Sequence, residues 1–239
     1  MVIIRHYAYS AKHYSEADPF PGRLFPLPAH CPHPECQAVD ALIRWGTFWR
    51  WACTRVEDYR ICVQRIRCKV CGRTHCLLPD FLHPHRHYVL SLLQRVVCLY
   101  ILTGLSLAEL MEYLMEEGPD RSTVREWITS FAHGAGQLLF DLLRRRLMDL
   151  NPLAELPKTP PPEHLDRVPG PSKRCLLTNT HRFWHLAEHL YAQSKVCLSH
   201  LHFTGDQLLS FVLHWIQNEG IPPRLFWSPR LPTTPSEAF

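Results

Sequence analysis

The stretch Gln64-Arg65-Ile66-Arg67-Cys68-Lys69-Val70-Cys71-Gly72-Arg73-Thr74 decides how the rest of the chain is interpreted. It holds two cysteines separated by two residues, and Gly72 then permits the left-handed residue that such a turn needs. Upstream, Cys31-Pro-His-Pro-Glu-Cys36 supplies a second cysteine pair with four intervening residues. Two pairs joined by a strand-rich segment predict a zinc ribbon, in which Cys31, Cys36, Cys68 and Cys71 bind one structural Zn²⁺. Four thiolates close the coordination shell and leave no position for a reactive water.

Several other cysteines and histidines lie near these pairs and are weighed as alternative ligands. Three single cysteines are interpreted as small buried hydrophobic residues, although any of them is a ligand if the ribbon is irregular: Cys53, Cys62 and Cys76. Two histidines flank the first pair and are candidates to replace a cysteine: His30 and His33. Three alternating histidines follow the ribbon and are interpreted as polar surface rather than a second metal site: His83, His85 and His87.

Length and composition predict a folded chain of one domain or two small ones. At 239 residues, with 46% hydrophobic and 11% aromatic residues, the chain can bury a core without disulfides. No signal peptide begins the sequence, so we expect a cytoplasmic protein, in which paired cysteines act as metal ligands. The apolar run at 89–102 contains Gln94 and Arg95 and is too short to span a bilayer, so no membrane segment is expected.

Positive charge is concentrated on the predicted ribbon. The net charge is only +4, but residues 41–100 contain ten Arg or Lys side chains against three acidic ones. Such an excess favours a surface that meets a polyanion, and the alternative is an ordinary solvated surface.

From residue 88 the hydrophobic period becomes helical and predicts three short helices. The first ends at Thr103-Gly104, the second is capped by Ser106, and the third is capped by Asp120. On the third helix, residues 124, 127, 128 and 131 are apolar and face inward. This order predicts a helix-turn-helix, with a three-helix bundle and a solvated face as the alternative. A glycine-rich step at 134–136 interrupts or restarts the helix that follows.

The predicted DNA contacts come from the ribbon, the connector and the outward face of the third helix. In a helix-turn-helix that face enters the major groove, where Arg pairs with guanine and hydroxyl groups reach bases or phosphate. The residues are Arg65, Arg67, Lys69, Arg73, Arg86, Arg121, Ser122, Thr123, Arg125 and Thr129.

The predicted fold class is α+β, mainly α, in four segments. Residues 1–87 form the zinc ribbon of short antiparallel strands with an N-terminal extension, in which residues 2–4 are a candidate strand. Residues 88–150 form the helix-turn-helix domain, 151–171 a Pro-rich linker, and 172–239 a C-terminal helical segment. Alternation over residues 59–64 predicts one buried and one exposed strand face. The C-terminal segment contains three tryptophans that either pack on the first domain or form a surface that binds a partner: Trp184, Trp215 and Trp227.

The cysteine pair, the Arg-rich hairpin, the run from Gln64 to Thr74 and the helices behind it resemble a known pattern. They resemble the zinc ribbon and helix-turn-helix of bacterial insertion-sequence transposases and their accessory DNA-binding proteins. They also resemble an uncharacterised, DUF6431-like family of ribbon-bearing bacterial proteins found near transposase genes. The resemblance covers roughly residues 25–135. It implies binding to double-stranded DNA, a role in transposition, and a separately encoded transposase as partner.

The same resemblance raises the question of catalysis, because transposases use three carboxylates to hold two metal ions. Acidic residues from position 160 onward are few, and none follows a recognisable strand: Glu163, Asp166, Glu188, Asp206, Glu219 and Glu237. We therefore expect no catalytic site and a zinc-dependent, nucleoid-associated accessory or regulatory protein, with a homodimer left open. The alternatives are a protein-interaction adaptor that uses the ribbon and Trp-rich helices, and a truncated transposase remnant.

Overall fold

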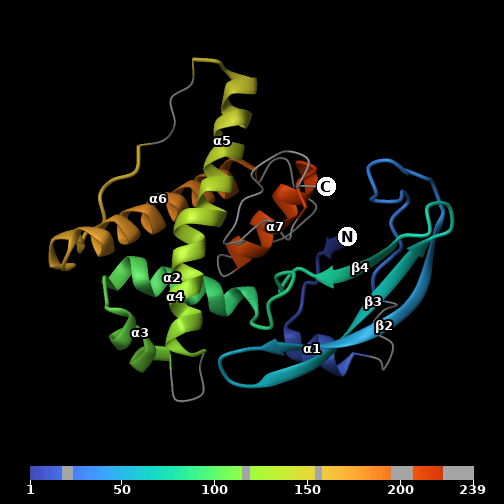
Figure 1. The fold of residues 1–239 in the computed structure, drawn as a ribbon, viewed down its shortest axis with the longest axis horizontal. Coiled ribbons are helices and arrows are strands. Elements are labelled where there is room, and N and C mark those ends of the chain that lie inside the picture. The colour runs from blue at the N-terminus through green and yellow to red at the C-terminus, as the bar shows by residue number, and fades with distance from the viewer. Residues whose placement is uncertain (18–23, 115–118, 154–157, 195–206, 223–239) are drawn as a thin grey trace. The chain divides into compact units, whose positions relative to one another are not determined.

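The computed structural model describes residues 1–17, 24–114, 119–153, 158–194 and 207–222. This part of the chain has an α+β fold, with one four-stranded sheet and more residues in helices than in strands (Figure 1). The expected fold class is confirmed at this level. The chain divides into two compact units, one made of residues 1–90 with the described residues from 213 onward, and one made of residues 91–212.

The first unit is built on a sheet with the strand order β1-β4-β3-β2. Its strands are β1 (Val2–Arg5), β2 (Leu42–Cys53), β3 (Asp58–Cys68) and β4 (Thr74–Pro79). β2 and β3 form an antiparallel hairpin, β4 pairs antiparallel with β3, and β1 joins β4 in the parallel direction. The expected strand at residues 2–4 is confirmed, but the hairpin strands are longer than predicted. β2 contains a bulge between Arg44 and Gly46, and its pairing with β3 continues beyond the bulge in a shifted register.

The centre of β3 is buried on both faces. Residues 61–64 are all buried, so the predicted alternation of a buried and an exposed face is wrong here. One face is covered by α1 (Ala11–Glu16), whose fully buried Tyr14 donates its hydroxyl to the Cys62 carbonyl at 3.1 Å. The Gln64 side chain is satisfied within the sheet, because its amide donates to the Gly46 carbonyl at 2.6 Å. A helix far away in sequence therefore covers a face that local periodicity assigned to solvent.

In the next three helices, the end of α2 and the starts of α3 and α4 lie at the predicted signals. α2 (Leu90–Thr103) stops before Gly104, which has φ +61. α3 (Leu107–Leu114) is capped reciprocally: the Glu109 amide donates to the Ser106 hydroxyl at 3.3 Å, and the Ser106 amide donates to the Glu109 carboxylate at 2.7 Å. α4 (Arg121–Ser130) is capped by Asp120, which accepts from the Thr123 amide at 2.9 Å. The predicted inward residues of the third helix are all buried: Val124, Trp127, Ile128 and Phe131.

The glycine-rich step after α4 changes the helical winding without breaking the helix. A π-helical turn (Phe131–Ala135) connects α4 to α5 (Gly136–Leu150). α6 (Pro171–Ser194) packs at this junction, where the rings of Phe131 and Trp184 lie 6.1 Å apart. A Cβ atom added at Gly136 would lie 2.0 Å from Cδ2 of Phe183. The glycine therefore permits the close approach of α5 and α6.

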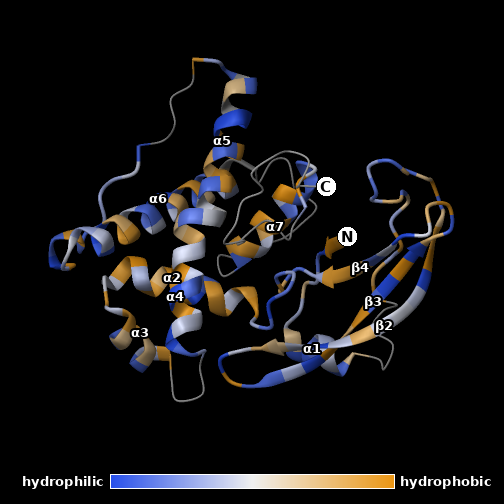
Figure 2. Ribbon diagram, in the orientation of Figure 1, coloured by the Kyte–Doolittle hydropathy of each residue, from blue (hydrophilic) through white to orange (hydrophobic). Residues whose placement is uncertain are grey.

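The C-terminal part contains the helices that the sequence predicts. In the Pro-rich segment, a 3₁₀ turn (Leu165–Arg167) and the buried Val168 precede α6, so this part packs instead of running free. α7 (Leu208–Asn218) is predominantly hydrophobic (Figure 2). Trp184 and Trp215 are buried, and Trp227 lies outside the described residues. None of the helices in the described ranges combines the length and the apolar character needed to cross a bilayer.

Candidate metal centre and adjoining basic residues

Four cysteines from two turns of the first unit come together in one cluster. Cys31 and Cys36 come from the loop before β2, Cys68 is the last residue of β3, and Cys71 lies in the turn between β3 and β4. The Sγ atoms of Cys31 and Cys71 are 3.8 Å apart, as are those of Cys36 and Cys68, and all four lie within 4.8 Å of one another. Sulfurs at the corners of a tetrahedron around Zn²⁺ are separated by about 3.8 Å, against about 2.05 Å in a disulfide. The predicted cysteines therefore form a cluster compatible with a zinc site.

The backbone shapes each cysteine pair into a turn with a left-handed residue after the second cysteine. In the second pair, the Gly72 amide donates to the Cys68 carbonyl at 3.0 Å, and Gly72 has φ +70, as expected for a glycine at this place. In the first pair, the Cys36 amide donates to the His33 carbonyl at 2.9 Å. The next residue, Gln37, has φ +50, so the first turn takes the same conformation although no glycine marks it.

The thiols of the cluster differ in how readily they ionise. The backbone amides of Cys71 and Val70 point at the Cys68 sulfur and lower its pKa to about 7. Burial raises the pKa of Cys31 to about 12. Because a thiolate is the form that binds a metal, the buried Cys31 needs a nearby cation to ionise at neutral pH.

A buried histidine adjoins the cluster and was missed by the sequence analysis. His75 on β4 places its Nε2 3.7 Å from the Cys31 sulfur. Burial, and then nearby positive charge, lower the pKa of His75 to about 4, so its imidazole is neutral at physiological pH. A neutral ring with its hydrogen on Nε2 donates to the sulfur and orients it, as groups outside a metal's ligand shell commonly do. The only signal in the sequence is the alternation of β4, where His75 shares a face with the buried Leu77.

The alternative ligands do not join this cluster among the described residues. Cys62 is buried as a small hydrophobic residue, while Cys53 and Cys76 are half-buried. His30 and His33 also remain outside the cysteine group. Of the alternating histidines, one is buried and two are exposed, and they form no metal-binding group with one another: His83, His85 and His87.

The hairpin of β2 and β3 carries exposed aromatic side chains that contact arginines. Trp45, Trp49 and Trp51 are 54%, 54% and 48% exposed. A guanidinium lies over each of three rings on the hairpin, with Arg67 over Trp45 at 4.6 Å, Arg65 over Phe48 at 4.9 Å and Arg60 over Trp49 at 5.5 Å. We call this set the aromatic–basic hairpin: Trp45, Phe48, Trp49, Trp51, Arg60, Arg65 and Arg67. The tryptophans and Arg60 were not among the predicted contacts, although the spacing Trp45-x-x-x-Trp49-x-Trp51 was visible.

The predicted DNA contacts are distributed over both units, each with its own exposure. Near the cysteine turn, Arg65, Lys69 and Arg73 are exposed and Arg67 is half-buried, and Arg86, in the segment between β4 and α2, is also half-buried. On α4, four of the five predicted residues are exposed: Arg121, Ser122, Arg125 and Thr129. Thr123 is half-buried, and the hydroxyls of Ser122 and Thr123 both donate to Asp120. These two hydroxyls are therefore engaged in capping, whereas Arg121, Arg125 and Thr129 take no part in the cap.

Neither the comparison with curated proteins nor the comparison with solved structures gave a match. A family model described as a domain of unknown function, DUF6431, matches residues 33–109. The matched stretch contains Cys36, Cys68 and Cys71, the strands β2 to β4, and α2. Over these residues the chain is similar to DUF6431 domains.

Proposed function

We propose that this protein is a zinc-dependent DNA-binding protein that serves a mobile element as an accessory or regulatory factor. In this proposal one structural Zn²⁺ joins the two cysteine turns into a zinc ribbon, and α2, α3 and α4 act as a helix-turn-helix. The single observation that carries the proposal is the aromatic–basic hairpin, in which Arg67 directly precedes Cys68 of the cysteine cluster on β3.

Zinc is favoured because the cluster consists of thiolates alone. Soft sulfur ligands select zinc, copper(I) or iron–sulfur clusters, and a single tetrahedral set of four thiolates with spacings near 3.8 Å suits one zinc ion. All four positions are filled by protein, so the ion has a structural role. It would fix the ends of β2 and β3, where Leu42 is paired with Cys68.

Nucleic acid is favoured as the partner because exposed rings and fixed cations occur together. Arginines neutralise phosphates, and aromatic faces stack on bases or sugars. The guanidinium groups of Arg65 and Arg67 already lie over rings in the free protein, so less side-chain freedom is lost when they meet a phosphate. Lys69 and Arg73 add two exposed charges at the cysteine turn.

A role in transposition is supported by resemblance alone. The zinc ribbon followed by short helices is typical of proteins of insertion sequences, some of which act beside a separately encoded transposase. We propose that such a transposase is the protein partner, and that the α4 face with Arg121 and Arg125 reads the element ends. We also propose that the protein has no catalytic site of its own and that it associates with the nucleoid.

Neutralising the two ring-stacked arginines is expected to weaken binding to duplex DNA and to reduce its salt dependence. For Arg65→Gln with Arg67→Gln, the slope of log K against log salt should fall by about 0.9 for each phosphate that the variant no longer neutralises. Fluorescence titrations at several salt concentrations measure it. Arg55→Gln, in the exposed loop at the other end of the hairpin, is the matched control. Equal slopes in all three proteins would contradict a DNA-binding role for the hairpin.

Truncation of Arg125 separates base reading from backbone binding. If Arg125 pairs with a base, Arg125→Ala should weaken binding to the preferred site by about 1–3 kcal/mol and leave non-specific binding nearly unchanged. Equal weakening on every sequence would assign it to phosphate. A site selected from random duplexes supplies the preferred sequence, and Arg145→Ala, on the exposed face of α5, is the control.

A protein-interaction adaptor is the second candidate, and the exposed Trp45, Trp49 and Trp51 favour it. The helical tryptophans Trp184 and Trp215 contribute nothing to this candidate because they are buried. Tryptophan is enriched at the centres of protein interfaces. Salt distinguishes the two candidates, since apolar docking changes little with salt whereas phosphate binding weakens steeply.

A further inference from the structure

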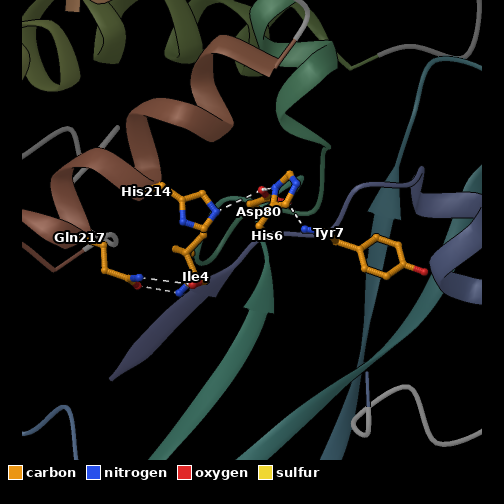
Figure 3. A network of polar contacts seen from close by, with 6 residues as sticks. All are labelled: Ile4, His6, Tyr7, Asp80, His214 and Gln217. Carbon is orange, nitrogen blue, oxygen red and sulfur yellow. Dashed lines mark hydrogen bonds and ion pairs between the residues drawn. The ribbon is translucent and has the colours of Figure 1, made fainter. Parts of the chain in front are cut away.

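Two histidines and an aspartate converge in the first unit, away from the cysteine cluster. Nδ1 of His6 lies 2.8 Å from Oδ2 of Asp80, and Nε2 of His214 lies 3.1 Å from the same oxygen (Figure 3). The three ligand atoms all lie within 4.8 Å of one another. The residues come from three separate segments, with Asp80 and His214 separated by 134 positions in the sequence.

The strand topology explains why these residues meet. Arg5 and Pro79 are the last pair of the parallel strands β1 and β4, so His6 and Asp80 follow neighbouring strands at the same edge of the sheet. His214 comes from α7, where Gln217 lies one turn further on the same helix face. Gln217 accepts from the Ile4 amide at 2.7 Å and donates to the Ile4 carbonyl at 3.3 Å, which fixes α7 beside the edge strand β1 (Figure 3).

The carboxylate is held in one orientation by backbone groups. Oδ1 of Asp80 accepts from the Tyr7 amide at 3.1 Å, which leaves Oδ2 directed at the two imidazoles (Figure 3). The Asp80 amide in turn donates to the Arg5 carbonyl at 2.9 Å. Such contacts are the kind that fix the ligands of a metal in place. The side chains of Asp80 and His214 are 4% and 8% exposed, whereas His6 is 21% exposed and marks the side from which a cation would reach the cluster.

We propose that His6, Asp80 and His214 form a second metal site, specific for a divalent first-row transition cation and separate from the cysteine cluster. Nδ1 of His6, Oδ2 of Asp80 and Nε2 of His214 are the three ligand atoms. Imidazole and carboxylate ligands together suit zinc, cobalt, nickel, iron(II) and manganese, whereas the thiolates of the cysteine cluster prefer softer metal ions. Within the described part of the chain three side chains supply ligands, and a three-ligand set of this kind leaves a further coordination position for another ligand.

The observed distances fit a site prepared for a cation. Metal–ligand bonds of about 2.0–2.2 Å separate the ligand atoms of a tetrahedral site by about 3.3–3.5 Å. The contact of His214 with Asp80 is a few tenths of an ångström shorter than this, and that of His6 is shorter by about half an ångström or slightly more, so binding needs an outward movement of the rings that is larger for His6. His6 can make this movement because it is the most exposed of the three. The proposal rests on this geometry alone and is independent of DNA binding.

The number of metal ions bound by the full-length protein tests the site. Native mass spectrometry after loading with Zn²⁺ should give two ions per chain for the wild type and one for His6→Gln and for His214→Gln. His87→Gln, at an exposed histidine of the same unit, should retain two. Loading with Co²⁺ identifies which site is filled, because only the cysteine cluster produces thiolate-to-cobalt charge-transfer absorption. That absorption should be unchanged in both histidine variants.

Each outcome decides for or against the site. One ion per wild-type chain with full charge-transfer absorption would overturn the proposal and make the three residues a hydrogen-bonded network only. Two ions in wild type and in both histidine variants would overturn it as well. One ion per wild-type chain without charge-transfer absorption, absent from both histidine variants, would support the histidine site and count against the cysteine site. If circular dichroism shows that the His214→Gln protein is unfolded, the ion count of His6→Gln alone decides the question. The His6 side chain is more exposed than that of His214, so its replacement disturbs the fold less.

Discussion

A Cys68→Ser variant is expected to lose the zinc ion of the cysteine cluster and to unfold the cysteine end of the sheet. Cys68 is the last residue of β3 and is fully buried, and its amide also donates to the Arg73 carbonyl at 3.0 Å. Loss of one ligand leaves three sulfurs that no longer hold the ion, so the two turns lose the bond between them. Structural zinc contributes folding free energy directly, about 10–16 kcal/mol in small zinc-binding domains. We expect no cooperative thermal transition of the first unit in this variant.

Zinc content and thermal unfolding of the same preparation measure this effect together. Cys53→Ser is the matched control, because Cys53 is a half-buried cysteine of the same hairpin that lies outside the cluster. It should retain one equivalent of charge-transfer absorption after loading with Co²⁺, and it should keep its cooperative transition. Removal of zinc from the wild type with a strong chelator should reproduce the Cys68→Ser behaviour. A Cys68→Ser protein that is folded with no metal at the cysteine cluster, as shown by the absence of charge-transfer absorption with Co²⁺, would contradict the structural role of the metal.

Features that depend on neighbouring residues could be predicted from the sequence. The capping residues Ser106 and Asp120 each accept a hydrogen bond from an amide three positions further along the chain, so both hydrogen bonds could be predicted from the local sequence. Gly104 ends α2 because a left-handed residue is needed at that single position. The cysteine pairs belong to the same class, since each turn is local and only the meeting of the two turns is not. Their spacing was therefore enough to predict the cluster.

Features that depend on distant segments could not be predicted. Burial of both faces of β3 requires α1, and the His6–Asp80–His214 cluster requires the parallel pairing of β1 with β4 and the position of α7. The hydrophobic pattern of one segment does not indicate which residue contacts it when that residue is more than 70 positions away, as His6 and His214 are from Asp80. His75 illustrates the same limit, because its neighbour Cys31 is 44 positions distant.

Gly136 shows how a local pattern is informative but incomplete. Its sequence context predicted an interruption of the helix, and helix propensity alone treats a glycine there as a weak point. In the structure Gly136 has φ −65 and lies in a regular helical conformation, with its amide donating to the Phe131 carbonyl. Nothing in its backbone angles requires glycine. The requirement comes from α6, where Phe183 occupies the space that a side chain would need.

Gly136→Ala is therefore expected to destabilise the second unit, against the sign that helix propensity predicts. Alanine in an exposed helix interior would gain about 0.5–1 kcal/mol over glycine. Here the new Cβ would lie 2.0 Å from Cδ2 and 2.1 Å from Cγ of Phe183, and 2.6 Å from the Phe131 carbonyl oxygen. The phenyl ring can turn aside only at the expense of its packing, and the carbonyl belongs to the helix itself. Overpacking of this kind costs about 1–3 kcal/mol and occasionally more, and we expect the upper end.

Urea unfolding followed by circular dichroism measures the free energy of unfolding for this variant and its controls. Combining Gly136→Ala with Phe183→Leu should recover about half of the stability difference, because the double mutant removes the ring clash but keeps the close approach to the Phe131 carbonyl. Gly170→Ala is the second control: Gly170 has φ +83 with no atom within 4 Å of an added Cβ, so its cost of about 1–2 kcal/mol reflects backbone strain alone. That cost should not change when Phe183→Leu is added. A Gly136→Ala protein as stable as the wild type would mean that α5 and α6 do not approach through this glycine.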